Sequence, residues 1–403
     1  MSDASAREVW ILSAKRTAFG AFGGTLKDVK ATDLGTAAAR AALAQSGLSA
    51  ADIDQVVFGC VAQTTPEDVY AARHIGLRAG LPVEVPALTV NRLCGSGFQA
   101  ILSAAQDIRG GDSQAALVGG TESMSLAPHV VRGARWGLAF GKAPPLEDLL
   151  WTTLTDTYAG CSMGETAENV AEQAGISRAD ADAYSLESQR RWAAADAAGR
   201  FADEIVPFEV KAKSKGKAGP IAFARDEHPR PESTAEGLAK LPPVFRPGGT
   251  VTAGTASGIA DGAAALVVAS RAFAESKGVK PLGRLVGWGI AGVEPRMMGL
   301  GPVPAIRQAL GRAKMAPGQI DLYEVNEAFA PQILAVAREL ALPMDRTNVN
   351  GGAIALGHPL AASGARIAGH LLYELGRRKA RFGVGAACIG GGQGIAVILE
   401  SLL

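Results

Sequence analysis

The sequence contains an internal duplication, and this feature limits the possible folds more than any other. An Ala-rich helical pattern at residues 38–43 recurs at 305–310, and a short hydrophobic segment follows each copy, at 55–59 and 322–326. Equivalent residues lie at one constant offset: Arg40 and Arg307, Leu43 and Leu310, Asp54 and Asp321. Chance similarity between Ala-rich helices would not keep one offset across several kinds of element, so we interpret the chain as two copies of one unit.

The duplication continues through a second helix and two further strands. A Ser-Gly pair opens the next helical pattern in both copies, at residues 98–109 and 365–377. Strand-like segments follow each helix, at 115–120 and 263–269 in the first copy and at 382–388 and 395–399 in the second. Alternating helices and strands favour the α/β class, with helices packed on a sheet. Two such copies predict a pseudo-symmetric core.

A long excursion interrupts the first copy. We therefore expect a first core half at residues 1–120 plus 251–276, an inserted loop domain at 121–250, and a second core half at 277–403. Within the insertion, the pattern predicts one long helical stretch, Thr166–Ala198, and then an irregular stretch, Lys211–Gly249. Insertions of this length on a rigid core commonly form lids or binding surfaces.

Composition excludes several classes of protein. Hydrophobic residues make up 48% of the chain and charged residues only 20%, which excludes a disordered chain. The net charge of +1 provides no field to bind nucleic acid or an anionic membrane, and no apolar run is long enough for membrane insertion. The start of the chain carries acids rather than an apolar signal, and its four cysteines form no Cys-x-x-Cys pair. We expect a cytoplasmic protein without a structural metal site.

Cys94 is the first candidate reactive residue. It lies at the strand-to-helix junction of the first copy, where the positive end of the helix is expected to stabilise a thiolate. The flanking Gly95 and Gly97 are expected to allow close backbone approach and unusual φ values. The alternative is a small buried hydrophobic residue, which is a common fate of a free cysteine.

His358 and Cys388 occupy Gly-rich junctions of the second copy. Matching loops of a pseudo-symmetric core converge on its axis, so Cys94 and His358 are expected to meet, and a Cys–His pair suits nucleophilic catalysis. The alternative for His358 is a histidine that caps a turn. The loop after Cys388 resembles a phosphate-binding loop but lacks its Lys and its helix, whereas a second thiol at this place can exchange a proton with a carbanion.

At these three segments the sequence closely resembles the thiolases, and the resemblance covers almost the whole chain. Further segments carry it: Arg16-Thr-Ala-Phe-Gly20, Gly119-Gly-Thr-Glu-Ser-Met124, Met163-Gly-Glu-Thr-Ala-Glu168, Asp226-Glu-His-Pro-Arg230, Gly299-Leu-Gly-Pro-Val-Pro304 and Asn326-Glu-Ala-Phe-Ala330. The resemblance implies a five-layered αβαβα core with an inserted loop domain. It also implies an acyltransferase that cleaves 3-oxoacyl-CoA with coenzyme A, or runs the reverse Claisen condensation.

The resemblance assigns roles to five residues. Cys94 would be the nucleophile that carries the acyl group, His358 the base, and Cys388 the acid or base for the acetyl-CoA carbanion. Asn326 would hold a water that serves the enolate together with His358, and the N–H groups of Gly390 and Cys94 would serve the tetrahedral intermediate.

The resemblance also implies where coenzyme A binds, as a substrate and not as a permanent cofactor. Ser257, Arg225, Arg230, Met163 and Met298 are the candidate contacts for CoA and acyl-CoA. The basic run of Lys211, Lys213, Lys215 and Lys217 would face the phosphates or, as the alternative that we favour, form a solvated linker. Family members are homo-oligomers, so a homodimer or homotetramer is expected.

Three departures from the family pattern affect the specificity. Ser162 stands where short-chain acetoacetyl-CoA thiolases have His, Thr255 replaces a usual Asn, and Ala361 replaces a usual Gly. The chain is most similar to the 3-ketoacyl-CoA thiolases of fatty-acid degradation. The alternatives are a biosynthetic acetoacetyl-CoA thiolase with strict short-chain specificity and a non-catalytic acyl-CoA or lipid-binding protein on the same scaffold, although a pure binder would not need three reactive side chains.

Overall fold

The protein is built on a mixed sheet that runs through its whole core. The computed structural model describes residues 7–214 and 217–403, and in this part the long sheet has the strand order β15-β16-β17-β14-β1-β13-β5-β3-β4. Its first half contains β1 (Val9–Thr17), β3 (Gln55–Gly59), β4 (Ala87–Val90), β5 (Ala115–Ser123) and β13 (Ala260–Ser270). Its second half contains β14 (Gly283–Gly292), β15 (Leu322–Val325), β16 (Phe382–Ile389) and β17 (Gln393–Ser401).

The two halves of the sheet repeat one another. β3, β5 and β13 correspond in order to β15, β16 and β17, as the duplication predicts. The strands β1 and β14, which precede the recognised repeats, complete each half and were not found from the sequence. The halves join where β1 and β14 pair over only two positions, Trp10 with Arg284 and Ile11 with Gly283.

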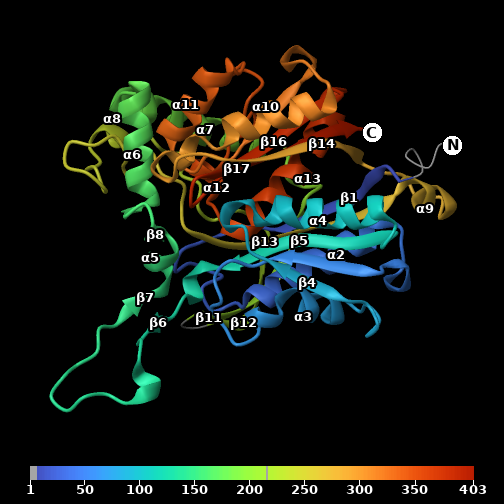
Figure 1. Cartoon of the computed structure of the whole chain (residues 1–403), viewed down its shortest axis with the longest axis horizontal. Helices are drawn as coiled ribbons and strands as arrows, with labels where there is room; N and C mark the ends of the chain where they lie inside the picture. Colours follow the sequence, from blue (N-terminus) through green and yellow to red (C-terminus); the bar gives the residue numbers. More distant parts are fainter. Residues whose placement is uncertain (1–6, 215–216) are drawn as a thin grey trace.

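The helices make the fold five-layered, as expected from the resemblance (Figure 1). The central layer is α4 (Ser96–Gly110) and α13 (Leu360–Arg378), which share one apolar cluster with strands of both halves. Four helices form the outer layers: α2 (Ala31–Ser46) and α3 (Ala71–Arg78) on the first half, α10 (Pro302–Ala313) and α11 (Ala330–Leu340) on the second. The fold class inferred from the sequence is therefore confirmed.

The repeated Ser-Gly pairs meet at the centre of the molecule. A Cβ on Gly97 of α4 would lie 2.5 Å from the backbone nitrogen of Ala365, and one on Gly364 of α13 would lie 2.5 Å from that of Phe98. Real side chains never approach backbone this closely, so the helices are in contact because both positions are glycine.

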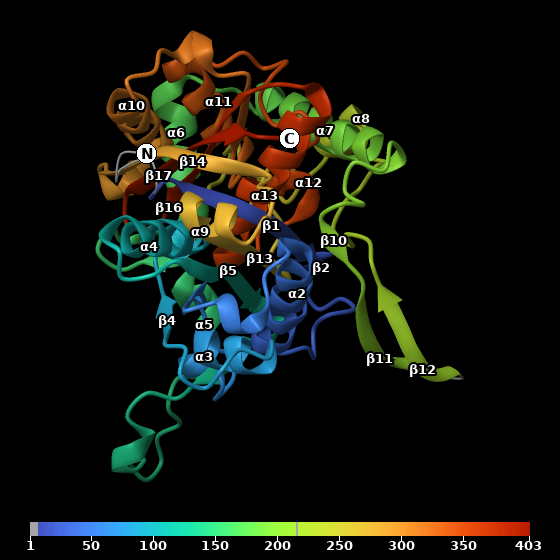
Figure 2. The ribbon, with the colours of Figure 1, turned by 90° about the vertical axis from the view of Figure 1, so that its right-hand side faces the viewer.

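The insertion leaves the sheet after β5 and returns to it at β13, its antiparallel neighbour. The predicted single helix from 166 to 198 is wrong: it consists of α6 (Met163–Ala174) and α7 (Arg178–Ala197), because Gly175 at φ 59 ends the first helix and Ser177 caps the second. The stretch expected to be irregular begins with a hairpin of β11 (Phe208–Ser214) and β12 (Lys217–Phe223), which projects from the body (Figure 2). Lys215 and the side chains of Lys211, Lys213 and Lys217 lie outside the described residues.

The remaining elements are short. In the insertion they are η4 (Met124–Leu126), β6 (His129–Val130), η5 (Ala134–Trp136), β7 (Glu147–Asp148), α5 (Leu149–Thr153), β8 (Thr155–Asp156), β9 (Cys161–Ser162), β10 (Ile205–Val206) and α8 (Ala235–Ala239). Elsewhere they are β2 (Gly20–Ala21), η1 (Ala50–Asp52), η2 (Asp68–Tyr70), η3 (Leu93–Gly95), α9 (Arg271–Ser276), η6 (Pro295–Leu300), η7 (Pro317–Gln319) and α12 (Ala353–Leu356). β10 pairs in parallel with β1, which ties the insertion to the core sheet. Among the described residues, no helix is long and apolar enough to cross a membrane.

Candidate active site

Cys94 sits in the turn η3, between β4 and the start of α4. The glycines beside it serve close approach, as expected: a Cβ on Gly95 would lie 2.5 Å from the Ile389 side chain. The expected unusual φ at these glycines is wrong, because the positive φ of 46° falls on Leu93, the residue just before Cys94. A non-glycine residue held at positive φ is strained, so the turn is held in place by its surroundings.

The expectation that the helix terminus lowers the pKa of Cys94 stays a prediction, because other effects also act on this thiol. Burial raises the pKa of this thiol to about 11, although the N–H groups of Gly390 and of Cys94 itself, which donate to the sulfur, act in the opposite direction. Burial is the largest of the effects on this pKa, and it outweighs the N–H groups at the start of α4 (Ser96–Gly110). Cys94 is therefore a neutral thiol at physiological pH and needs a base to become a nucleophile.

His358 has the protonation state of such a base. Its Nδ1 lies 2.6 Å from Ser363 Oγ, which itself donates to the carbonyl oxygen of Pro359, so Nδ1 carries the proton and Ser363 accepts it. The Nε2 lone pair then faces Asn326 Nδ2 at 3.3 Å. Burial, with a contribution from the charge of Arg366, lowers the pKa of His358 to about 3, so the imidazole is neutral. The unprotonated Nε2 is available to accept a proton.

Cys388 and Gly390 mark the end of β16 and the turn into β17. Cys388 is fully buried, and burial, together with the neighbouring Cys94, raises the pKa of its thiol. The turn Gly390–Gly392 has φ of 79° and 76° at Gly391 and Gly392, so glycine is required there by the backbone as well as by space. Cys388 thus stays protonated beside the nucleophile.

The structure brings the predicted reactive residues together. Cys94 packs against Leu360 and Ala361, which follow His358 closely in the chain, and the N–H of Gly390 reaches its sulfur. The apolar wall beside Cys388 contains Met298 and Phe329, with Met163 and Phe245 packed against it. Two candidate substrate contacts, Met163 and Met298, therefore lie beside the reactive thiols.

The predicted arginines have partners within the protein. Arg225 pairs with Asp196 at 2.9 Å and lies over the Trp192 ring, while its side chain is 69% exposed. The guanidinium of Arg230 donates to the carbonyl groups of residues 227–229. The backbone N–H of Ser257 donates to the carbonyl of Ala328, beside the apolar wall. The structure thus places Ser257 beside the thiols, whereas Arg225 and Arg230 both bond to other residues of the insertion.

The three departures have local structural roles. Ser162 caps α6: its side chain accepts the N–H of Glu165, and the Glu165 side chain accepts the N–H of Ser162 at 2.6 Å. Thr255 is fully buried and accepts the N–H of Thr252 at 2.8 Å. Ala361 packs in the apolar cluster with Cys94.

Two residues of the site have roles that the sequence did not indicate. Ser363 was recognised only as part of a repeated Ser-Gly pair, yet it sets the tautomer of His358. Glu122 lies in a recognised segment, and its buried carboxylate accepts backbone N–H groups near both Cys94 and His358. The signal for Glu122 was the one ionisable residue in an otherwise uncharged strand, which needs partners when buried.

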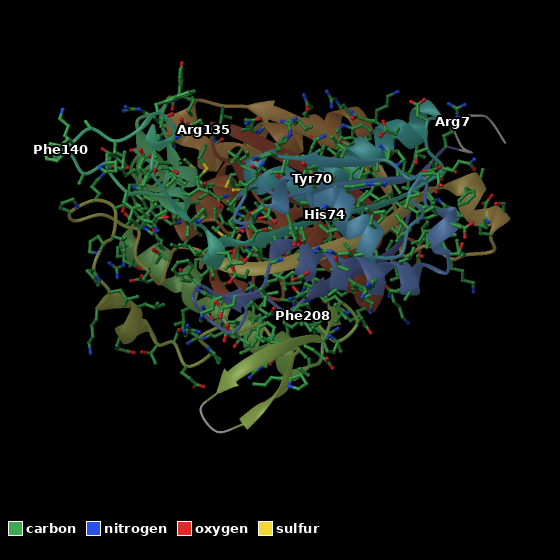
Figure 3. All side chains as sticks on the ribbon, turned by 90° about the horizontal axis from the view of Figure 1, so that it is seen from below. Arg7, Tyr70, His74, Arg135, Phe140 and Phe208 are labelled. Carbon is green, nitrogen blue, oxygen red and sulfur yellow. The ribbon has the colours of Figure 1, made fainter. Side chains whose placement is uncertain are left out.

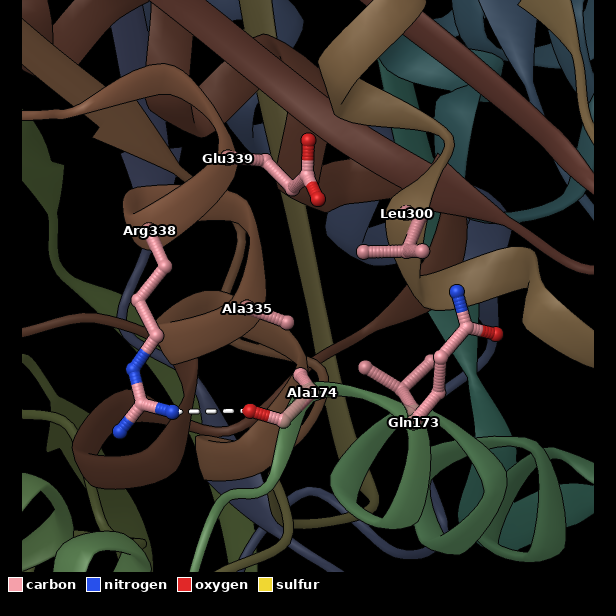
Figure 4. Close-up of a pocket in the computed structure, with 7 residues that line it drawn as sticks. Gln173, Ala174, Leu300, Ala335, Arg338 and Glu339 are labelled. Atoms are coloured by element: carbon pink, nitrogen blue, oxygen red, sulfur yellow. Dashed lines mark hydrogen bonds between the residues drawn. The ribbon is translucent and has the colours of Figure 1, made fainter.

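Figure 4 shows a surface pocket between α6, η6 and α11. Its volume is about 300 Å³, and seven residues line it: Val170, Gln173, Ala174, Leu300, Ala335, Arg338 and Glu339. None of these is a predicted site residue. Among the described residues, no group of three or more His, Cys, Asp or Glu side chains is placed to hold a metal ion.

Fold and site together define an enzyme class: a duplicated α/β protein with a Cys–His–Cys set suited to acyl transfer through a thioester. Comparison with known families agrees. Residues 9–272 match the thiolase N-terminal domain and residues 279–401 the thiolase C-terminal domain. The chain belongs to the thiolase family, whose members are acyltransferases.

Similar proteins carry two kinds of name. Mitochondrial 3-ketoacyl-CoA thiolases of Bos taurus and Homo sapiens are each 54% identical over 395 residues, covering 98% of both chains. An acetyl-CoA acetyltransferase of Syntrophomonas wolfei is 48% identical over 401 residues, which is 98% of this chain and 100% of the relative. The crystal structure of human mitochondrial 3-ketoacyl-CoA thiolase superposes with a TM-score of 0.96 at 53% identity and covers 99% of this chain and 100% of its own.

Proposed function

We propose that this thiolase cleaves 3-oxoacyl-CoA with coenzyme A, giving acetyl-CoA and a shortened acyl-CoA, and catalyses the reverse condensation, through an acyl-enzyme on Cys94. One observation carries the proposal. The N–H groups of Cys94 and Gly390 lie beside the Cys94 sulfur, where they lower the pKa of the thiol, and the protonated Cys388 thiol is next to it. Once the thiolate has attacked a carbonyl carbon, N–H groups at this place can donate to the oxygen that gains charge.

The first half-reaction begins with a proton transfer. His358 Nε2 takes the proton of Cys94, and the thiolate attacks the 3-oxo carbon of the substrate. The oxygen that gains charge is stabilised by the N–H groups of Cys94 and Gly390. The bond between the second and third carbons then breaks, which leaves the shortened acyl group as a thioester on Cys94.

The leaving group of that step is the carbanion of acetyl-CoA. Cys388 gives it the thiol proton, and the high pKa of a buried thiol keeps this proton in place until the carbanion forms. The enolate oxygen is served by the Asn326–His358 pair; Asn326 Oδ1 is buried without a hydrogen-bond partner in the described structure, which suits a bound water.

Between the half-reactions the proton that His358 took from Cys94 passes to the Cys388 thiolate, which restores both residues. In the second half-reaction His358 takes the proton of the CoA thiol, and the CoA thiolate attacks the thioester. The Cys94 thiolate leaves as the shortened acyl-CoA departs, and His358 returns the proton to Cys94. Met163, Met298 and Ser257 are proposed to contact the pantetheine arm, because they line the apolar wall beside the thiols. Arg225 and Arg230 are proposed to face the nucleotide phosphates. A structurally similar protein, human mitochondrial 3-ketoacyl-CoA thiolase, has been solved in complex with CoA.

Cys94→Ala tests the reaction. We expect no CoA-dependent loss of 3-oxoacyl-CoA and no mass increase of the chain after incubation with substrate. Cys161→Ala is the matched control, since Cys161 is partly exposed but lies outside the set. Full activity of Cys94→Ala would overturn the proposal, and binding without turnover in the wild type would favour the non-catalytic binder.

The substrate range is proposed to include medium chains. Ser162 is used to cap α6, at the position where short-chain enzymes have His, and the wall beside Cys388 is apolar. A biosynthetic acetoacetyl-CoA thiolase is the second candidate, because a similar relative is named acetyl-CoA acetyltransferase. Values of kcat/KM on C4, C8 and C10 substrates decide, and a strict preference for C4 would favour the second candidate.

A homodimer is proposed to form through the open edge of the sheet. β4 ends the strand order, and its Leu88 is 49% exposed. Tyr70 and His74 stack on each other (Figure 3), and His74 belongs to α3, which packs against β4. An edge strand with exposed apolar side chains is a template for pairing with a second copy. Light scattering of Leu88→Lys against wild type tests this dimer.

A further association to a homotetramer is proposed to use the arm, residues 127–148, which projects from the body (Figure 1). Large hydrophobic side chains are exposed along it: Val131, Trp136, Leu138, Phe140 and Leu146. Deletion of the tip would leave a dimer.

The cytoplasm stays the proposed compartment, because all four cysteines are free thiols; fractionation of cells tests it.

A further inference from the structure

Glu122 lies at the middle of the site, although the proposed reaction does not use it. Its carboxylate is fully buried near the end of β5. Three backbone N–H groups converge on it: Ala62 at 2.9 Å, Ala361 at 3.0 Å and Val61 at 3.3 Å. These donors come from two separate chain segments, one after β3 and one at the start of α13.

One of those contacts holds the segment of the catalytic base. Ala361 is in the first turn of α13, whose N–H groups have no partner within the helix, and it follows His358 by three residues. The same strand holds the other side of this residue: a Cβ on Gly120 would lie only 1.8 Å from the carbonyl oxygen of Ala361, so only glycine fits. β5 therefore accepts the N–H of Ala361 and also lies close to its C=O.

The other contacts lead to the nucleophile. Glu122 accepts the N–H of Val61, and the carbonyl of Val61 accepts Asn91 Nδ2 at 3.3 Å. Asn91 Oδ1 in turn accepts the N–H of Leu93 at 3.0 Å, which is the strained residue just before Cys94. A continuous chain of hydrogen bonds thus connects Glu122 with the turn of the nucleophile.

Apolar packing closes the same unit. Val61, Leu360 and Ala361 belong to one buried cluster, and Cys94 packs against it. The two segments that Glu122 holds are therefore in contact with each other and with the reactive sulfur, so a shift of either segment moves Cys94 relative to His358.

We propose that Glu122 is a positioning residue that holds the turn of Cys94 in register with the segment of His358. It acts through Val61, Asn91 and Ala361 and touches no reacting atom. The assignment rests on the proposed function, because the alignment of Cys94 with His358 matters only if both residues act in the same reaction. Displacements of about 1 Å at such a pair cost on the order of 10²-fold in rate.

The charge of Glu122 has a second effect, opposite in sign. Burial raises the pKa of this carboxyl to about 7, with a smaller contribution from Asp68, whereas the three N–H groups lower it. Above that pH the carboxylate is ionised, and its charge adds to burial in raising the pKa of Cys94. Glu122 thus aligns the thiol for reaction while making it harder to ionise, and these effects are separable by experiment.

The test compares Glu122→Gln, Glu122→Asp and, as a matched control, Asp54→Asn. Asp54 accepts backbone N–H groups at the opposite end of β5, with the amide of Gln114 at 2.7 Å. In Glu122→Gln the NH2 group of the amide replaces one carboxylate oxygen, so at least one backbone N–H loses its acceptor and faces another donor. The segments should then shift, and kcat/KM should fall by about 10- to 100-fold. Glu122→Asp keeps the charge but shortens the reach, so kcat/KM should also fall, whereas Asp54→Asn should stay near wild type.

Alkylation of Cys94 by iodoacetamide, followed by peptide mass, separates positioning from loss of structure. Glu122→Gln should move the pH profile of alkylation to lower pH, because a negative charge is removed, even as turnover falls. Glu122→Asp should leave that profile near wild type, and Cys161 is an internal reference for accessibility. Turnover of both Glu122 variants within twofold of wild type would overturn the assignment, as would equal loss of alkylation and turnover. Alkylation needs no thiolase reaction, so it remains informative if Cys94→Ala disproves the proposed function.

Discussion

The two central helices occupy equivalent places in the duplicated core but differ in what they bury. The buried residues of α4 are uncharged; they include Phe98, Ile101 and Leu102. α13 is buried without interruption from Leu360 to Leu375, and this stretch includes Arg366, His370 and Glu374.

The difference follows from the insertion. It covers the second half and supplies Glu204, which lies 2.7 Å from His370, while Glu324 of the core pairs with Arg366 at 2.7 Å. A buried ionisable side chain is tolerated only with such partners. The duplication therefore provides the geometry of the site, while the core and the one-sided insertion each supply a carboxylate partner for the buried ionisable side chains of α13.

The largest expected effect comes from removing the base on the polar side. In His358→Ala, Cys94 with its pKa of about 11 has no proton acceptor, so only a preformed thiolate reacts. General-base catalysis contributes about 10²- to 10⁴-fold, and kcat/KM at neutral pH should fall by this amount. The variant should then gain rate with rising pH up to about 11, whereas wild type does not. A variant with the wild-type pH profile would contradict the role.

Removal of the buried cation that anchors the insertion should have the next largest effect. Arg16 of β1 is 1% exposed and bonds Glu204 at 2.7 Å and Asp226 at 2.6 Å, both from the insertion. Arg16→Met leaves two buried carboxylates without their partner, so the free energy of unfolding should fall by about 3–5 kcal/mol. Chemical denaturation measures this, with Arg132→Met as control, because the Arg132–Glu147 pair on the arm is exposed. Equal shifts for both variants would contradict the comparison.

The contact between the two central helices predicts an intermediate effect. In Gly97→Ala the new methyl group would lie 2.5 Å from a backbone nitrogen of α13, so the helices must separate, at about 1–3 kcal/mol. Gly311→Ala in α10 is the matched control: its Cβ would meet nothing within 4 Å, and it should stabilise the protein by about 0.4–1 kcal/mol. Thermal unfolding should show shifts of opposite sign; shifts of the same sign would refute the close-contact explanation.

The parts of the fold predicted from the sequence are those marked by local pattern. The repeated helices and strands follow from periodicity, whereas the five layers were implied by the family resemblance that motifs such as the segment around Cys94 carry. β1 and β14 were missed because the repeats were aligned on Ala-rich helices, which lie after them. The break at Gly175 was missed because one glycine is tolerated within a helical pattern.

The sequence predicted which candidate residues lie close together, but not their electrostatic state. The pKa of Cys94 depends on how much protein surrounds its sulfur and on an N–H from Gly390, which is remote in the chain. The tautomer of His358 depends on Ser363, and the role of Glu122 on three donors from other segments. Such properties arise from tertiary packing, so no local pattern encodes them.

The smallest expected effect is at the exposed face of the insertion. Arg225 pairs with Asp196 but remains 69% exposed, so Arg225→Ala should change the free energy of unfolding by only about 0–1 kcal/mol. If its guanidinium also faces the CoA phosphates, the KM for CoA should rise several-fold while kcat stays unchanged, because phosphate contacts hold substrate and transition state equally. Arg190→Ala is the matched control, an exposed arginine of α7. Equal KM values for the two variants, compared in steady-state kinetics over CoA concentration, would remove Arg225 from the binding site and leave recognition to the apolar wall beside Cys388.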